Sequence, residues 1–138
     1  MRQFRQLLAI SLALGALAGL TACSGTITET YSDACPIAGR YAVVGYQPGA
    51  TTAYRGEAII SASGSGCLMT WFQPNESEGN GSYSNGVLTI YFAFPGGGNG
   101  IVKYTRMPNG ELQGSWWMVN TPNRQGTETL TPISLAPR

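Results

Sequence analysis

The chain has 138 residues, among them 8 lysines and arginines, 7 aspartates and glutamates, and no histidine, so its formal net charge is +1. A chain so near to neutral lacks the basic surface that attracts nucleic acid, and we expect no nucleic-acid partner. The absence of histidine removes the commonest general base and metal ligand. No spacing of the carboxylates requires two of them to face each other across a cleft, as a glycosidase would need. We therefore expect no metal, no cofactor and no enzyme activity.

Residues 1–22 have the layout of a secretory leader. Arg2 and Arg5 form a positive start, and the apolar run 7–20 that follows is too short to span a bilayer stably. The run Leu20-Thr21-Ala22-Cys23 resembles the lipobox of bacterial lipoproteins, which implies that Cys23 is acylated and becomes the first mature residue. The alternative is an ordinary secretory leader with an incidental cysteine.

The resemblance to lipoproteins also implies a location. Ser24 follows the cysteine in place of the aspartate that favours retention in the inner membrane, so we expect a lipid anchor in the bacterial outer membrane. Residues 23–38 are rich in serine and threonine up to residue 34, without apolar periodicity, and are expected to form the lipidated cysteine and its tether.

Two cysteines remain once Cys23 is lipidated. In an oxidising compartment an even pair is most simply a disulfide, here Cys35 with Cys67. A metal pair or a reactive thiol are the alternatives. The bridge would join the segment before the first strand to the third strand.

From Gly39 onward, apolar residues recur with a period of two, which predicts strands and no helix. The Asn-Gly pairs at 85–86, 99–100 and 109–110 are typical of tight hairpin turns, so neighbouring strands should be antiparallel. Eight such strands close naturally into an up-and-down barrel over 39–132, which leaves a tail at 133–138. The expected strands are Gly39–Tyr46, Ala53–Ser61, Gly66–Gln73, Glu78–Ser84, Gly86–Phe94, Gly100–Met107, Gly110–Val119 and Gly126–Pro132.

The alternation also predicts which side chains point into the barrel. The third strand is apolar on both faces, which leaves its orientation open. The expected inward residues of the other strands are Tyr41, Val43, Tyr54, Ala58, Ile60, Leu88, Ile90, Phe92, Val102, Tyr104, Leu112, Trp116 and Leu130.

A set of spaced glycines and aromatics covers the whole expected barrel. It is similar to a family of small bacterial exported proteins that are often labelled fibronectin-binding, and more loosely to the calycin and avidin barrels, whose interiors hold small ligands. The first resemblance implies an extracellular-matrix partner but no binding residues; the second lacks a clear polar set for reading a ligand. The motifs that carry the resemblance are Gly39-Arg40-Tyr41, Tyr54-Arg55-Gly56, Trp71, Gly79-Asn80-Gly81, Tyr104, Gly110-Glu111-Leu112-Gln113-Gly114-Ser115-Trp116 and Gly126-Thr127-Glu128.

Five inner aromatics are candidates for a calyx that carries a small apolar ligand, because an eight-stranded barrel is just wide enough to hold one. The alternative is that they fill the barrel as core. They are Tyr41, Tyr54, Phe92, Tyr104 and Trp116.

Three outer residues are candidates for binding a protein partner. Trp117 falls on the face opposite to Trp116, where an exposed tryptophan can anchor a partner. Glu76 and Glu78 belong to an acidic loop that can dock a cationic cleft, as in an inhibitor of a cell-wall hydrolase. From the sequence we expect a non-catalytic surface binding module for a protein partner, with ligand carriage or hydrolase inhibition as alternatives.

Two charged residues, Arg106 and Glu128, share the inward parity of their strands near a barrel end. We expect them to pair there, with structural rather than functional meaning.

Overall fold

The computed structural model describes residues 33–72 and 76–135, and the expected leader, Cys23 and most of the expected tether lie outside them. Within this part the chain is all β, as the periodicity predicts. Its strands are β1 (Gly39–Tyr46), β2 (Tyr54–Ser63), β3 (Gly66–Trp71), β4 (Ser77–Ser84), β5 (Val87–Ala93), β6 (Asn99–Arg106), β7 (Leu112–Met118) and β8 (Gln125–Leu135).

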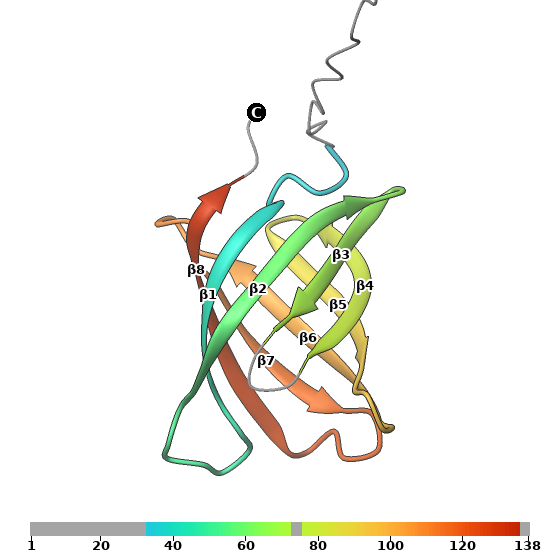
Figure 1. The fold of residues 1–138 in the computed structure, drawn as a ribbon, viewed down its shortest axis with the longest axis vertical. Coiled ribbons are helices and arrows are strands. Elements are labelled where there is room, and N and C mark those ends of the chain that lie inside the picture. Colours follow the sequence, from blue (N-terminus) through green and yellow to red (C-terminus); the bar gives the residue numbers. More distant parts are fainter. Residues whose placement is uncertain (1–32, 73–75, 136–138) are drawn as a thin grey trace, which may run out of the picture.

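The eight strands form one closed barrel (Figure 1). Each strand pairs with its sequence neighbours in antiparallel fashion, and β1 pairs with β8 to close the ring. The predicted up-and-down barrel is therefore confirmed, and the architecture is consistent with a calycin-like fold. The last strand runs beyond the expected end, since Leu135 still pairs with Gly39 after a register shift between Arg40 and Tyr41.

The predicted alternation of side chains is confirmed on the six strands for which inward residues were named. All the expected inward residues are buried except Tyr54, which is half-buried at the start of β2. The structure also decides the orientation of β3. Cys67, Met69 and Trp71 point into the core, whereas Leu68 and Thr70 lie on the outer face, which continues to the exposed Phe72.

The predicted Asn-Gly turns differ in outcome. Asn85 and Gly86 both have positive φ, 51° and 78°, as a two-residue hairpin with this pair requires. Gly110 also has positive φ, and the side chain of Asn109 accepts a hydrogen bond from the Glu111 amide. The prediction of a turn at 99–100 is wrong, because both residues belong to β6. The positive φ angles of that connection lie at residues 96–98 instead.

One end of the barrel is closed by the segment that enters β1. Cys35 and Ile37 of this segment are buried, and the predicted disulfide from Cys35 to Cys67 is confirmed, with 5.4 Å between the Cα atoms. The hydroxyl of Tyr41 donates a hydrogen bond to the Ile37 carbonyl at 2.6 Å. In Figure 1 the segment lies across the upper end of the barrel.

We call the other end the mouth. The connections that follow β1, β5 and β7 lie at this end, which is the lower end in Figure 1. The described residues contain no helix long and apolar enough to cross a membrane.

Candidate functional site

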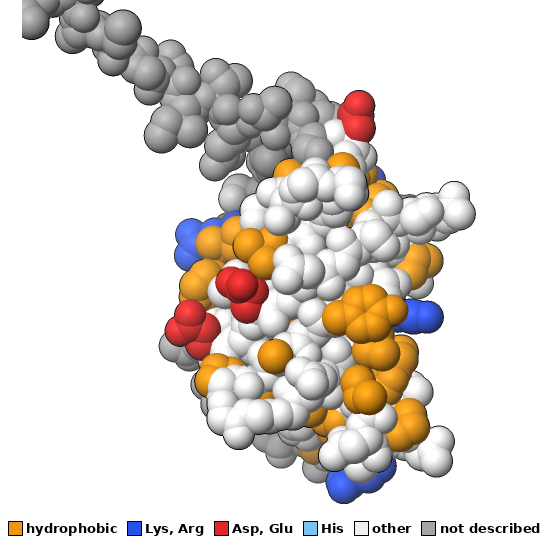
Figure 2. Space-filling view, turned by 90° about the vertical axis from the view of Figure 1, so that its right-hand side faces the viewer, with side chains coloured by type: hydrophobic (Ala, Val, Ile, Leu, Met, Phe, Trp, Pro, Cys, Tyr) orange, Lys and Arg blue, Asp and Glu red, His pale blue; other side chains and the backbone are white. Residues whose placement is uncertain are grey.

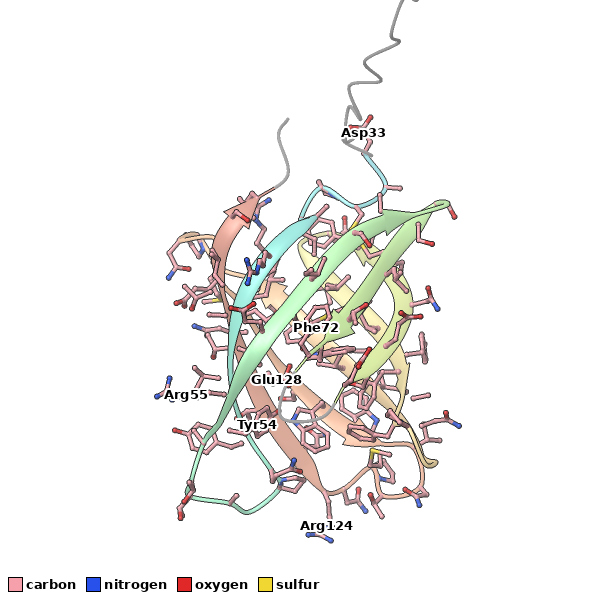
Figure 3. All side chains as sticks on the ribbon, in the orientation of Figure 1. Asp33, Tyr54, Arg55, Phe72, Arg124 and Glu128 are labelled. Atoms are coloured by element: carbon pink, nitrogen blue, oxygen red, sulfur yellow. A yellow bond between two sulfur atoms is a disulfide. The ribbon has the colours of Figure 1, made fainter. Side chains whose placement is uncertain are left out.

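A buried carboxylate, Glu128 on β8, forms the centre of a polar cluster inside the barrel. Its Oε1 accepts a hydrogen bond from the Tyr54 hydroxyl at 2.7 Å. Its Oε2 accepts from the indole Nε1 of Trp71 at 3.2 Å and from the Tyr104 hydroxyl. Figure 3 shows Tyr54 and Glu128 inside the half of the barrel that leads to the mouth, while the neighbouring Arg55 points away from it. Donors from β2, β3 and β6 thus converge on one carboxylate.

Glycines on both neighbouring strands make room for this convergence. Glu128 pairs with Gly45 of β1 on one side and with Gly114 of β7 on the other. A Cβ at Gly45 would lie 2.3 Å from Cζ of Tyr54, and one at Gly114 would lie 2.7 Å from Cδ1 of Tyr104. Each tyrosine therefore reaches the carboxylate by lying over a strand that carries no side chain at that position.

Burial raises the pKa of the Glu128 carboxyl above its ordinary value, even though hydrogen bonds from Tyr104, Tyr54 and Trp71 favour the ionised form. Burial, and then the adjacent carboxylate, likewise raise the pKa values of the Tyr54 and Tyr104 hydroxyls, so both remain protonated donors at neutral pH. At the closed end, burial raises the pKa of Tyr41 to about 12.

The raised pKa of Glu128 makes a prediction about stability and pH. The pKa of this carboxyl is 4.5 in the unfolded chain and higher in the folded one. At a pH between these two pKa values, the unfolded chain has released a proton that the folded chain still holds. Stability from this group is therefore full below 4.5 and falls as the pH rises through the folded pKa. The groups that face the carboxyl are Tyr54 of β2, Trp71 of β3 and Tyr104 of β6, and none of them is basic.

Urea unfolding of the wild type and of Glu128→Gln across this range tests the sign. The free energy of unfolding of the wild type should fall relative to that of the variant as the pH rises above 4.5. A relative gain in stability with rising pH would show that the donors outweigh burial.

A pocket of about 680 Å³ opens at the mouth. Its wall is mostly apolar, with the ring of Trp116 and the side chain of Met118 contributed by β7. Both Phe94 and Met118 are partly buried against the core, so the pocket continues the inner surface of the barrel. The lining residues are Gln47, Glu76, Phe94, Pro95, Gly97, Trp116 and Met118.

Trp116 lies between the pocket and the Glu128 cluster. Only 8% of its surface is exposed, and its Nε1 is buried without a hydrogen-bond partner among the described residues. The indole packs over Gly126, where an added Cβ would lie 2.4 Å from Cε2. Trp116 also lies close enough to Tyr54 to oppose the rise in the pKa of the Tyr54 hydroxyl.

The five predicted ligand-binding aromatics do not share one site. Trp116 alone among them lines the pocket, while Tyr54 and Tyr104 serve the Glu128 cluster. Phe92 packs edge-on against both Trp71 and Phe94, between the cluster and the pocket. Tyr41 belongs to the closed end.

The expected pair of Arg106 and Glu128 is wrong. Strands β6 and β8 run in the same direction, and Arg106 ends β6 whereas Glu128 lies near the start of β8. Arg106 therefore lies toward the closed end, beyond the level of Tyr104, which contacts Glu128. Arg106 instead lies close enough to Tyr41 at the closed end for its charge to oppose the rise in the pKa of the Tyr41 hydroxyl that burial causes.

The predicted partner-binding residues are separated as well. Trp117 points outward as expected and is half-buried, in register with Ile101. Glu76 lines the pocket at the mouth, whereas Glu78 is exposed on β4. Residues 73–75 of the predicted acidic loop lie outside the described residues.

Sequence reasoning missed Phe94, Met118 and Trp71 as site residues. The signal was present for the first two: Phe94 continues the inward parity of Phe92, and Met118 that of Trp116. For Trp71 no signal was available, because both faces of its strand are apolar.

The chain was compared with protein-family models and with curated protein sequences, and neither comparison finds a match. The described residues contain no group of three or more histidine, cysteine, aspartate or glutamate side chains able to hold a metal ion. Fold and geometry thus define the class, an eight-stranded up-and-down barrel with one closed end and a pocket at the other.

Proposed function

We propose that this protein is a non-catalytic binding protein that holds a small, largely apolar molecule in the mouth of its barrel. The observation that carries the proposal is the pocket of about 680 Å³, within the size range of small-molecule sites and walled by Phe94, Trp116 and Met118. The closed strand ring supports the pocket, and its polar lining residues Gln47 and Glu76 are exposed.

Binding of the neutral fluorophore N-phenyl-1-naphthylamine tests the proposal. We expect Met118→Asp to weaken binding by roughly tenfold or more, because a charge would replace an apolar wall of the pocket. Val119→Asp is the matched control, since the next side chain along the chain is 57% exposed outside the wall. Equal affinities in the two variants, or no binding by the wild type, would contradict the proposal.

A protein partner on the outer wall is the second candidate, and one observation favours it. Tyr91, Ile101 and Trp117 lie in register on the outer face of β5, β6 and β7, and Tyr91 is 62% exposed. Figure 2 shows hydrophobic side chains gathered along one flank of the barrel wall. Aromatic side chains grouped in this way can anchor a partner. Trp117→Ala should weaken such a partner and leave the fluorophore bound, whereas Met118→Asp should do the reverse.

The anchor and the location are part of the proposal. The lipobox at residues 20–23 supports acylation of Cys23, and the segment after it supports a tether that holds the barrel at the outer membrane. Extracellular-matrix binding and inhibition of a cell-wall hydrolase stay predictions of the sequence. Mass spectrometry of the intact protein purified from membranes tests the anchor, since acylation adds the mass of the lipid and cleavage before Cys23 removes the mass of residues 1–22.

A further inference from the structure

The buried carboxylate of Glu128 has no charged partner among the described residues. Its three hydrogen bonds come from uncharged donors. Arg40 forms a salt bridge with Glu57 outside the barrel, and Arg106 lies toward the closed end. A carboxylate held away from water without a counter-charge is unfavourable, and a bound cation would offset this cost.

Two chains of side-chain contacts connect this carboxylate to the pocket. On one side, Trp116 of the pocket lies beside Tyr54, which donates to Glu128. On the other, Phe94 of the pocket packs on Phe92, whose ring centroid lies 5.6 Å from that of Trp71, the second donor. The carboxylate is therefore separated from the pocket by a thin layer of aromatic rings.

Among its described lining residues, the pocket has one acidic side chain, Glu76, and no basic one. Gln47 supplies the amide in this described part of the lining. Aromatic faces attract cations through their quadrupole, and the rings of Trp116 and Phe94 are in the wall. Because the rest of the wall is apolar and partly shielded from water, the attraction between charges is stronger here than at an open surface.

We infer that the pocket selects an organic cation with apolar substituents, with Glu76 and the ionised form of Glu128 as its negative charges and the pocket's aromatic rings as its walls. The inference rests on the proposed function and names its ligand class. An alkylammonium group meets these requirements: its charge lies near Glu76, on the pocket side of the rings that cover Glu128, and its hydrocarbon part contacts Met118 and Phe94. An anionic ligand of the same size would be repelled by Glu76 and by ionised Glu128.

Three probes of equal chain length test the inference by calorimetry at low ionic strength: decyltrimethylammonium, decanol and decanoate. We expect the cation to bind roughly tenfold more tightly than the alcohol, and decanoate to bind most weakly. Cation and alcohol binding equally, or decanoate binding most tightly, would overturn the inference while leaving the proposed function intact. If none of the probes binds although the fluorophore does, the inference alone fails; if the fluorophore does not bind either, both fail.

Two variants show whether the acids cause the preference. Glu76→Gln should lower the ratio of cation to alcohol affinity about threefold. It should not disturb the fold, because the side chain of Glu76 is exposed. Glu128→Gln, which keeps the shape of the side chain and an acceptor for Tyr54, should lower that ratio further. Glu78→Gln is the matched control, because this acid is exposed on β4 and does not line the pocket. An unchanged ratio in both Glu76→Gln and Glu128→Gln would overturn the inference.

Discussion

Replacing both Cys35 and Cys67 by alanine is expected to lower the free energy of unfolding by about 3 to 4 kcal/mol, the entropy of closing a loop of this length in the unfolded chain. The bridge spans a sequence separation of 32 residues. It also holds the segment that buries Ile37 against the closed end, so its loss should loosen this end first.

Urea unfolding followed by tryptophan fluorescence measures this loss, with Cys23→Ser as the common background so that no free thiol at residue 23 interferes. The wild-type pair in the same background is the control. An unchanged unfolding midpoint in the double alanine variant would show that the segment is held by packing alone.

The second large effect is expected at Gly114. A Cβ at this position would lie 2.2 Å from the Lys103 carbonyl oxygen and 2.7 Å from the ring of Tyr104. The first contact is with backbone that pairs β6 to β7, so it is relieved only by distorting the ladder, and the second displaces a donor to Glu128. We expect Gly114→Ala to cost about 3 kcal/mol.

Gly45→Ala is the matched comparison on the other side of Glu128. There the nearest atoms to an added Cβ all belong to the outer part of the Tyr54 ring, which can swing toward the mouth. The expected cost is about 1 to 2 kcal/mol, mainly for the lost hydrogen bond to the carboxylate. Equal losses of stability in the two variants, measured by urea unfolding, would show that the backbone contact at Gly114 is not the cause.

The barrel was predictable from the sequence because its determinants are local. A side-chain period of two decides which residues face inward, and Asn-Gly pairs mark the hairpins that make neighbours antiparallel. The exception at 99–100 has a physical reason: the glycines at 96–98 already supply the positive φ angles of that turn, so the Asn-Gly pair extends β6 instead.

The pairing of Arg106 with Glu128 failed for a different reason. Parity tells whether a side chain points inward but not how far along the barrel it lies. That position depends on strand direction and on the stagger of the strands around the ring. Arg106 ends β6, whereas Glu128 lies level with Tyr104 through Gly114 of β7, so the two side chains lie at different heights in the barrel.

By itself, the sequence determined the all-β class, the inward and outward faces of most strands and the order of the hairpins, since each follows from residues close together in the chain. It also indicated the disulfide, from the pair of cysteines that remains once Cys23 is assigned to the expected lipid. The tertiary structure alone decided the rest. It brought Tyr54, Trp71 and Tyr104 from three strands to Glu128 on a fourth, and it placed a pocket at one end while the Cys35 segment closed the other. Those contacts depend on the stagger of a closed barrel and on the glycines that let side chains cross a strand, neither of which is visible in the pattern of any one strand.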